Sequence, residues 1–305
     1  MVTARSATGL FVLLAALWGT SYVAVKAALP ALPPLLLAAL RYDIAGVLVL
    51  AYAVGTTDRW RPSTRADFRL IATGGTLLIA ANYGLLFSGQ QYLTSAAAAI
   101  VAGLTPVLTS VFAAVLLTDE RLGSAGIVGT VLGFAGVAII ARPDPANLLS
   151  SDMLGVGFVM LATASFALGT VLTRRFRTTL PLVSMQAWMM LVGAVLLHIA
   201  SIASPAESLR TVEWTGTAVI AVGYLAIVAG AGGFLLYFAL LDQLGAFEIN
   251  LVTYVAPVFA ALAGWMLLGE RFCVETALGF ACIIAGFALI KWDALLGIRD
   301  RAMSS

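Results

Sequence analysis

Ten apolar segments follow one another along this 305-residue chain, and they constrain its fold more than any other feature. Most have close to the roughly 20 residues that an α-helix needs to cross a bilayer. Only 10% of the residues are charged, compared with roughly 25% in soluble domains. The segments are too long and too uniformly apolar for the strands of a barrel. The sequence therefore predicts an all-α membrane protein with ten transmembrane helices, at residues 9–29, 34–54, 69–90, 94–117, 123–140, 152–173, 182–203, 214–240, 246–268 and 274–292.

The chain also contains one sequence pattern twice, at an offset of about 150 residues. The matched residues are Pro106 with Pro257, Glu120-Arg121 with Glu270-Arg271, Gly129 with Gly279, Gly136 with Gly286, and Ile140 with Ile290. Five segments per half is an odd number, so we expect the second half to insert upside down, as in many transporters. The predicted organisation is a first repeat at 1–140, a linker at 141–151, a second repeat at 152–293 and a tail at 294–305.

Lysine and arginine set the expected orientation, because they gather in cytoplasmic loops. With a cytoplasmic N-terminus, the outer loops contain only Arg142, Arg210 and Arg271, and the other loop lysines and arginines are inside. Both termini are then cytoplasmic. Residues 1–31 have features of a signal peptide, but this segment is long enough to span and has a counterpart in the sixth segment, so we expect it to be a transmembrane helix.

The combination of several local patterns resembles the EamA branch of the drug/metabolite transporter superfamily. These patterns are the Trp18-Gly19 pair, the Pro33-Pro34 turn, Arg41, and the helices with Thr105-Pro106 and Ala256-Pro257, each followed by a Glu-Arg turn. The resemblance covers the whole chain, and within this branch the chain is most similar to the YddG-type aromatic amino-acid exporters. It implies a 5+5 inverted repeat in the inner (plasma) membrane of a bacterium and transport of small metabolites.

The first and third segments provide most of the candidate binding residues. Trp18, Tyr22 and Lys26 share one helix face, and two rings with a terminal cation suit an aromatic zwitterion. Alternatively, Lys26 extends to the outer interface and Trp18 packs against the second segment. In the third segment, Asn82 lies next to a face that carries Tyr83, Phe87 and Gln90. An apolar wall with a few hydrogen-bonding groups is typical of a small-molecule site, although Gln90 could instead lie at the membrane boundary.

Further candidates lie in the fourth, seventh and ninth segments. Pro106 and Pro257 each remove a backbone donor and free a carbonyl one turn earlier, so they are candidate hinges, with a static kink as the alternative. Asn250 and Tyr254 precede Pro257 and are candidate binding residues. Trp188 is a candidate cavity wall that could equally face lipid.

For the charged residues, the histidine and the glycines inside the segments, we favour structural interpretations. His198 and Glu248 suit the ends of their segments, and Arg41 is expected to find a partner in another helix or a lipid headgroup. The stripe of Gly126, Gly129, Gly133 and Gly136 predicts close helix packing.

These features favour a secondary exporter of aromatic and other large neutral amino acids that works by alternating access. The alternative is a multidrug or organic-cation exporter, for which Glu248 would be the cation-binding group. The chain lacks motifs for a P-loop, a metal cluster or an intramembrane catalytic pair, so we expect no enzyme activity, no metal and no cofactor. The expected partners are a small-molecule substrate and the lipid bilayer but no nucleic acid, and the expected state is a monomer, with a dimer as the alternative.

Overall fold

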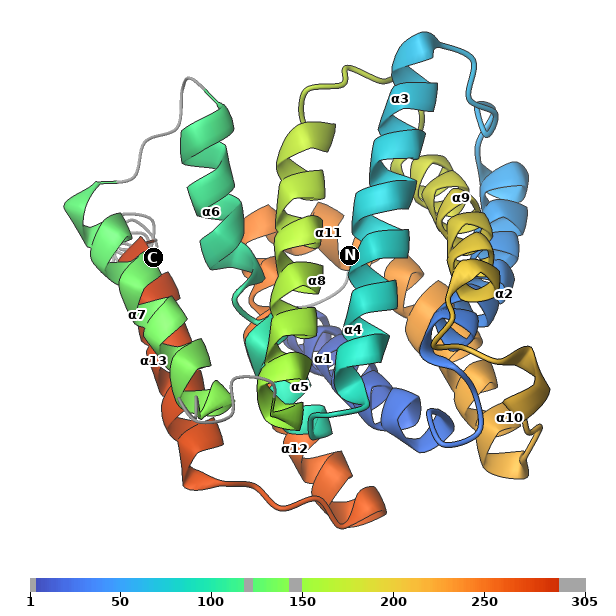
Figure 1. Cartoon of the computed structure of the whole chain (residues 1–305). Helices are drawn as coiled ribbons and strands as arrows, with labels where there is room; N and C mark the ends of the chain where they lie inside the picture. The colour runs from blue at the N-terminus through green and yellow to red at the C-terminus, as the bar shows by residue number, and fades with distance from the viewer. Residues whose placement is uncertain (1–3, 118–122, 143–149, 291–305) are drawn as a thin grey trace.

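The computed structural model describes residues 4–117, 123–142 and 150–290, with residues 4–6 and 246–247 described by their backbone alone. Within these residues the regular structure is helical (Figure 1), and nine helices are long and apolar enough to cross a membrane. They are Ala7–Ala28, Pro34–Thr56, Arg65–Gln90, Ser95–Leu116, Ser124–Ala141, Ser151–Thr173, Leu182–Ala203, Gly216–Gly245 and Glu248–Leu268. The tenth predicted segment is the shorter apolar helix Val274–Ile290. Most of the predicted linker at 141–151, all of the tail at 294–305 and the turn at 119–121 lie outside the described residues.

Several of these spans consist of more than one helical element. In chain order the elements are α1 (Ala4–Ala28), α2 (Pro34–Thr56), α3 (Arg65–Gly74), η1 (Gly75–Ala81), α4 (Asn82–Gln90), α5 (Ser95–Ala102), α6 (Thr105–Leu116), α7 (Ser124–Ala141), α8 (Ser151–Thr173), α9 (Leu182–Ala203), η2 (Leu209–Thr211), α10 (Gly216–Gly223), η3 (Tyr224–Gly232), α11 (Gly233–Asn250), α12 (Val252–Leu268) and α13 (Val274–Ile290). The short η2 is a 3₁₀ turn in a loop.

Two spans contain a stretch of π-helix in their middle. Residues Gly75–Ala81 form η1 between α3 and α4, and Tyr224–Gly232 form η3 between α10 and α11. A π-helix is wider than an α-helix, and short π stretches within α-helices are frequent at functional sites. Glycines at 74 and 75 and at 223 and 230 are compatible with this geometry, because a bare backbone allows the altered winding and close packing.

The fourth span is not the continuous helix that the sequence predicted over 94–117. Helix α5 ends at Ala102, and α6 begins at Thr105 after a turn at Gly103 and Leu104. Pro106 therefore lies in the first turn of α6, where its missing N–H removes no helical hydrogen bond. The carbonyl of Ala102 accepts a hydrogen bond from the Thr105 hydroxyl at 2.7 Å, so the break leaves this carbonyl paired.

A second break separates the eighth and ninth spans at Gly245. Its φ of 83° lies in the left-handed region that favours glycine, and the chain changes direction there. Beyond this break, Pro257 is inside α12 and not at its start.

Helices α7 and α13 pack closely through their glycines. A Cβ atom added to Gly129 would lie 2.3 Å from the carbonyl oxygen of Gly286, and one added to Gly136 would lie 2.6 Å from that of Gly279. The predicted packing role of this glycine stripe is therefore confirmed for α7 against α13.

The outward faces of the helices carry large apolar side chains. Ile199, Ile202 and Ile220 are 58%, 73% and 74% exposed. Such exposure is costly in water but suits contact with lipid tails, in agreement with the membrane location that hydropathy predicts.

Candidate functional site

A cavity of about 180 Å³ lies in the middle of the helical bundle. Its walls come from α1, α2, α4, α5, α8, α11 and α12, together with the turn at Gly103 and the first residue of α6. The lining residues are Trp18, Ser21, Tyr22, Val25, Arg41, Asn82, Tyr83, Leu86, Phe87, Gln90, Ala99, Ala102, Gly103, Thr105, Thr163, Phe166, Phe234, Thr253 and Ala256. Six of the ten binding residues proposed from the sequence are among them: Trp18, Tyr22, Asn82, Tyr83, Phe87 and Gln90.

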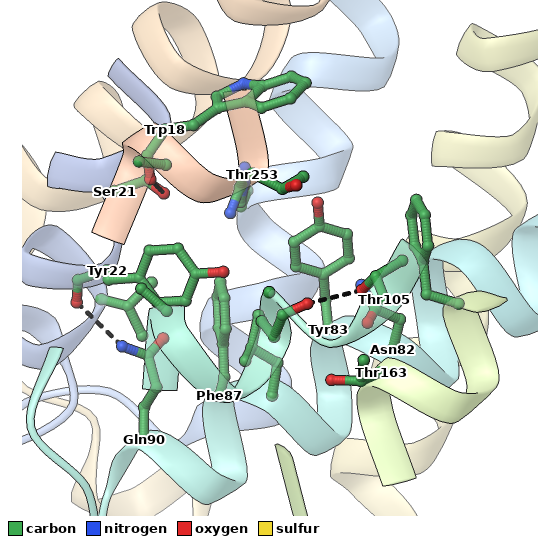
Figure 2. Close-up of a pocket in the computed structure, with 18 of the residues that line it drawn as sticks. Trp18, Ser21, Tyr22, Asn82, Tyr83, Phe87, Gln90, Thr105, Thr163 and Thr253 are labelled. Atoms are coloured by element: carbon green, nitrogen blue, oxygen red, sulfur yellow. Dashed lines mark hydrogen bonds between the residues drawn. The ribbon is translucent and has the colours of Figure 1, made fainter. Parts of the chain in front are cut away.

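Six of the lining residues are aromatic: Trp18, Tyr22, Tyr83, Phe87, Phe166 and Phe234. In the view of Figure 2, the rings of Tyr22, Phe87 and Tyr83 cross the middle of the picture, and Trp18 lies above them. The Tyr83 and Phe87 rings meet edge to face at 6.0 Å, and Trp18 lies 5.7 Å from Phe234. Such a wall gives a flat apolar or aromatic ligand a large contact area.

The π-helical stretches are tied to helices from the other half of the chain. Trp18 Nε1 in α1 donates a hydrogen bond to the carbonyl oxygen of Ala229 in η3, at 3.2 Å. In the corresponding place, Ser165 Oγ in α8 donates to the carbonyl oxygen of Leu77 in η1, at 2.9 Å. These bonds hold the wide turns of η1 and η3 beside the helices that line the cavity.

The cavity contains few polar groups, and some of them have no partner. The Asn82 side chain has no hydrogen-bond partner among the described residues and is 8% exposed. The Gln90 amide donates from Nε2 to the carbonyl oxygen of Tyr22 at 3.0 Å, while its Oε1 is buried without a partner. In contrast, the Thr163 hydroxyl donates to the carbonyl of Val159 in its own helix, and the Thr253 hydroxyl donates to the carbonyl of Asn250 at the end of α11. The Asn82 and Gln90 amides therefore have hydrogen-bonding capacity left for a ligand.

Arg41 also lines the cavity and was not in the binding set proposed from the sequence. Its side chain is 4% exposed, and its Cζ lies 5.2, 5.0 and 5.9 Å from the ring centres of Tyr42, Tyr83 and Phe87. Nε has no hydrogen-bond partner. Each cation–π contact contributes roughly 0.5–2 kcal/mol. The expected partner in another helix is therefore the pair of rings of Tyr83 and Phe87 in α4, not a carboxylate.

The other four proposed binding residues do not line this cavity. Lys26 is at the end of α1, where its Nζ donates to the carbonyl oxygens of Gln90 and Gln91 at 2.8 and 3.1 Å. Trp188 Nε1 donates to the carbonyl of Trp60 at 2.8 Å. Asn250 is exposed, and Tyr254 packs against Phe287. On α12, the face that meets the cavity carries Thr253 and Ala256. Hydropathy alone does not define how this helix is rotated about its own axis. A role in binding for these four residues stays a prediction.

The candidate hinges adjoin the cavity without lining it. Thr105 and Ala256, which directly precede Pro106 and Pro257, are lining residues. A Cβ atom on Gly19 in α1 would lie 2.3 Å from the carbonyl oxygen of Ala256, so α1 and α12 are in backbone contact at this point. The hinge role itself stays a prediction.

Two charged side chains hold the α4–α5 hairpin, which borders the cavity. On one side, Lys26 donates to the carbonyls of Gln90 and Gln91 at the end of α4. On the other side of the hairpin, the carboxylate of Glu270 accepts hydrogen bonds from the backbone N–H of Ser95 at 3.0 Å and from its hydroxyl at 3.1 Å. A carboxylate at the N-terminus of α5 is also favoured by the helix dipole.

The remaining acidic and histidine candidates are away from the cavity. His198 Nε2 lies 2.7 Å from Asp43 Oδ2, and both side chains are more than one-third exposed on the outside of α2 and α9. Glu248 is exposed near the Gly245 break. Within the described part of the chain, no carboxylate is among the cavity's lining residues, and no cluster of histidine, cysteine and acidic residues has a geometry that could hold a metal ion.

Comparison with known proteins places this architecture among transporters. The chain is 27% identical to the uncharacterized transporter YvbV of Bacillus subtilis over 299 residues, with 96% of each chain covered. It is 27% identical to the uncharacterized inner membrane transporter YedA of Escherichia coli K12, covering 90% of this chain and 87% of YedA. A solved crystal structure superposes with a TM-score of 0.63 at 25% identity, covering 95% of this chain and 98% of that one. The model of the EamA-like transporter family matches twice, at residues 6–142 and 153–292. This chain therefore belongs to the EamA-like transporter family.

Proposed function

We propose that this protein exports aromatic and other large neutral amino acids across the bacterial inner membrane, as the YddG-type exporters do. The central cavity is the observation that carries this proposal. Six aromatic residues line it and two amides have hydrogen-bonding capacity left, a combination typical of a small-molecule site. Its volume of about 180 Å³ suits a metabolite of amino-acid size. The name of YedA, an inner membrane transporter, supports the location.

The proposed architecture is ten transmembrane helices in a 5+5 inverted repeat, with 1–140 and 152–293 as the two repeats. The family model's two matches support this division. The α7–α13 contact also supports it. Gly129 and Gly136 in the first repeat correspond to Gly279 and Gly286 in the second, and the contacts join Gly129 to Gly286 and Gly136 to Gly279. Such exchange is expected when two equivalent helices are related by a two-fold axis.

Transport is proposed to proceed by alternating access, in which the two halves move around the cavity. Both halves contribute to its wall, α1, α2, α4 and α5 from the first and α8, α11 and α12 from the second. A movement of one half against the other would therefore open the same site to either side. Because one chain builds the whole cavity, we propose that a monomer is sufficient for transport.

The multidrug or organic-cation alternative has less support from this geometry. Glu248, the group it would need, is exposed and does not line the cavity. The one charged group among the lining residues is Arg41, which repels a cation.

Counterflow into proteoliposomes tests the proposal. Vesicles are preloaded with unlabelled substrate and given a panel of labelled amino acids, choline and a nucleotide sugar. We expect accumulation of phenylalanine, tyrosine or tryptophan, reduced by about tenfold or more in Trp18→Ala and Tyr83→Ala because each removes a cavity ring. Tyr92→Ala is the matched control, since Tyr92 is exposed and stacks on Phe158 away from the cavity. Accumulation of choline alone would contradict the proposal.

A further inference from the structure

Arg41 is the one charged side chain among the residues that line the cavity. It lies in the eighth position of α2, far enough from either end to be within the hydrophobic layer. Its 4% exposure makes it almost completely enclosed by protein. A charge at this depth is costly, and such residues are usually paired or functional.

No described residue neutralises Arg41. It has no ion pair or hydrogen bond with the described part of the chain, and its Nε is buried without a partner. Asp43, two residues further along α2, faces another direction and is engaged by His198. The Glu270 carboxylate is bound at the start of α5. The guanidinium instead contacts the rings of Tyr42, Tyr83 and Phe87.

These rings attract the cation only partly and leave its N–H donors available. A planar guanidinium can donate two parallel hydrogen bonds to a carboxylate, which is its best-matched anionic partner. An incoming carboxylate would therefore neutralise a buried charge that the protein itself leaves uncompensated.

We propose that Arg41 binds the carboxylate of the transported molecule, so that the substrate is an aromatic carboxylic acid, with amino acids as one class. This inference rests on the proposed function in one respect, namely that the central cavity is the transport site. It adds that the carboxylate is required for binding and that an amino group is not.

The surroundings of Arg41 favour a carboxylate over a phosphate ester. A phosphate ester carries up to two negative charges and three acceptor oxygens, which call for several cationic groups. Lys26, the other basic residue in these helices that could approach, is engaged with the carbonyls of Gln90 and Gln91. One cation between aromatic walls matches a singly charged ligand with an apolar body. The amides of Asn82 and Gln90 remain for a further polar group, such as an ammonium.

Competition binding to the purified full-length protein in nanodiscs tests this inference. Labelled phenylalanine and labelled 3-phenylpropionate are each displaced by phenylalaninamide, phenethylamine and phenyl phosphate. In the wild-type protein we expect both carboxylates to bind about 10- to 100-fold more tightly than the amide or the amine, the ratio expected for a charge-assisted hydrogen bond.

Three variants locate the carboxylate group. Arg41→Gln should reduce the preference for carboxylate over amide to about one, and Arg41→Lys should restore part of it because it keeps the charge. Lys26→Gln tests the competing site at the end of α1. Arg69→Gln, which removes an equal charge from the exposed side of α3, is the control for net charge. Melting temperatures of all variants show whether a lost signal reflects unfolding, and the ratio of two ligands on one sample is independent of the folded fraction.

The outcomes separate this inference from the proposed function. Binding of 3-phenylpropionate but not phenylalanine, with loss in Arg41→Gln, would support the Arg41 site and contradict an amino-acid exporter. Equal binding of phenylalanine and phenylalaninamide would overturn the Arg41 site and leave the exporter intact. The Arg41 inference is also overturned if Lys26→Gln abolishes the preference while Arg41→Gln retains it, if phenyl phosphate binds more tightly than the carboxylates, or if neither carboxylate binds.

Discussion

Individual glycines decide where two helices approach most closely. In α7, a Cβ on Gly129 would lie 2.3 Å from the carbonyl oxygen of Gly286 and 2.9 Å from Cγ1 of Ile290. Both distances are below normal van der Waals contact, and one involves backbone, which adjusts less easily than a flexible side chain.

Gly129→Ala should therefore destabilise the protein by roughly 1–3 kcal/mol, the usual cost of overpacking. Gly157→Ala is the matched control, because a Cβ at Gly157 in α8 has no neighbour within 4 Å. It should be neutral or slightly stabilising, since alanine is the better helix former by about 0.5–1 kcal/mol. Thermal unfolding of both variants in the same detergent measures the difference. Equal melting temperatures for the two would show that α7 and α13 do not pack as described.

Individual binding residues were only partly predictable from the sequence. Spacing placed Tyr83, Phe87 and Gln90 on one helix face, and these three do meet the cavity. Arg41 was visible as a charge within an apolar segment, but its neighbours depend on how α2 and α4 pack. On α12 the sequence suggested Asn250 and Tyr254, whereas Thr253 and Ala256 line the cavity. Adjacent faces of an almost uniformly apolar helix look alike, so hydropathy does not define its rotation.

At the scale of elements, the α4–α5 hairpin is held from both sides. Lys26 engages the end of α4 and Glu270 engages the start of α5. Both groups are charged, so these hydrogen bonds are stronger than neutral ones. We expect these contacts to keep this end of the cavity closed.

Glu270→Gln should loosen the hairpin. Losing the charge weakens the hydrogen bonds from Ser95, and backbone amides at 92–97 should exchange with deuterium about tenfold faster, as expected for a loss of about 1.5 kcal/mol. Glu275→Gln is the matched control, because Glu275 pairs with Arg142 at the α7–α13 contact. Hydrogen exchange measured by mass spectrometry compares the hairpin amides of the two variants with those of the wild-type protein. A hairpin that exchanges at the wild-type rate in Glu270→Gln would contradict the closing role of this carboxylate.

The limits of the spans were easier to predict than their internal geometry. A run of about 20 apolar residues is sufficient to predict a membrane helix, and the predicted segments agree closely with the observed helices. The π-helical turns of η1 and η3 accept hydrogen bonds from other helices, which the sequence does not reveal. Ser165 to Leu77 is one such contact, and it joins residues 88 positions apart.

At the scale of the whole molecule, the proposed inverted repeat makes a prediction about topology. A reporter fused after Ile290 should be cytoplasmic, so green fluorescent protein should fluoresce there and alkaline phosphatase should be inactive. Fusion at Gly269, between α12 and α13, should give the opposite pattern because that turn faces outward in the proposed orientation. Active phosphatase at the C-terminal fusion would contradict the orientation.

In the proposed mechanism, one cavity is the transport site and opens in turn to each side of the membrane. This mechanism is tested by the labelling of a single cysteine in the cavity. The two native cysteines, Cys273 and Cys282, are both free and are first replaced by serine. Ala102→Cys then places one thiol on the cavity wall at the end of α5.

A membrane-impermeant maleimide is applied to right-side-out and to inside-out vesicles, with and without phenylalanine. We predict labelling from both sides and protection by phenylalanine on each. Labelling from one side alone, or equal labelling with and without phenylalanine, would contradict the account.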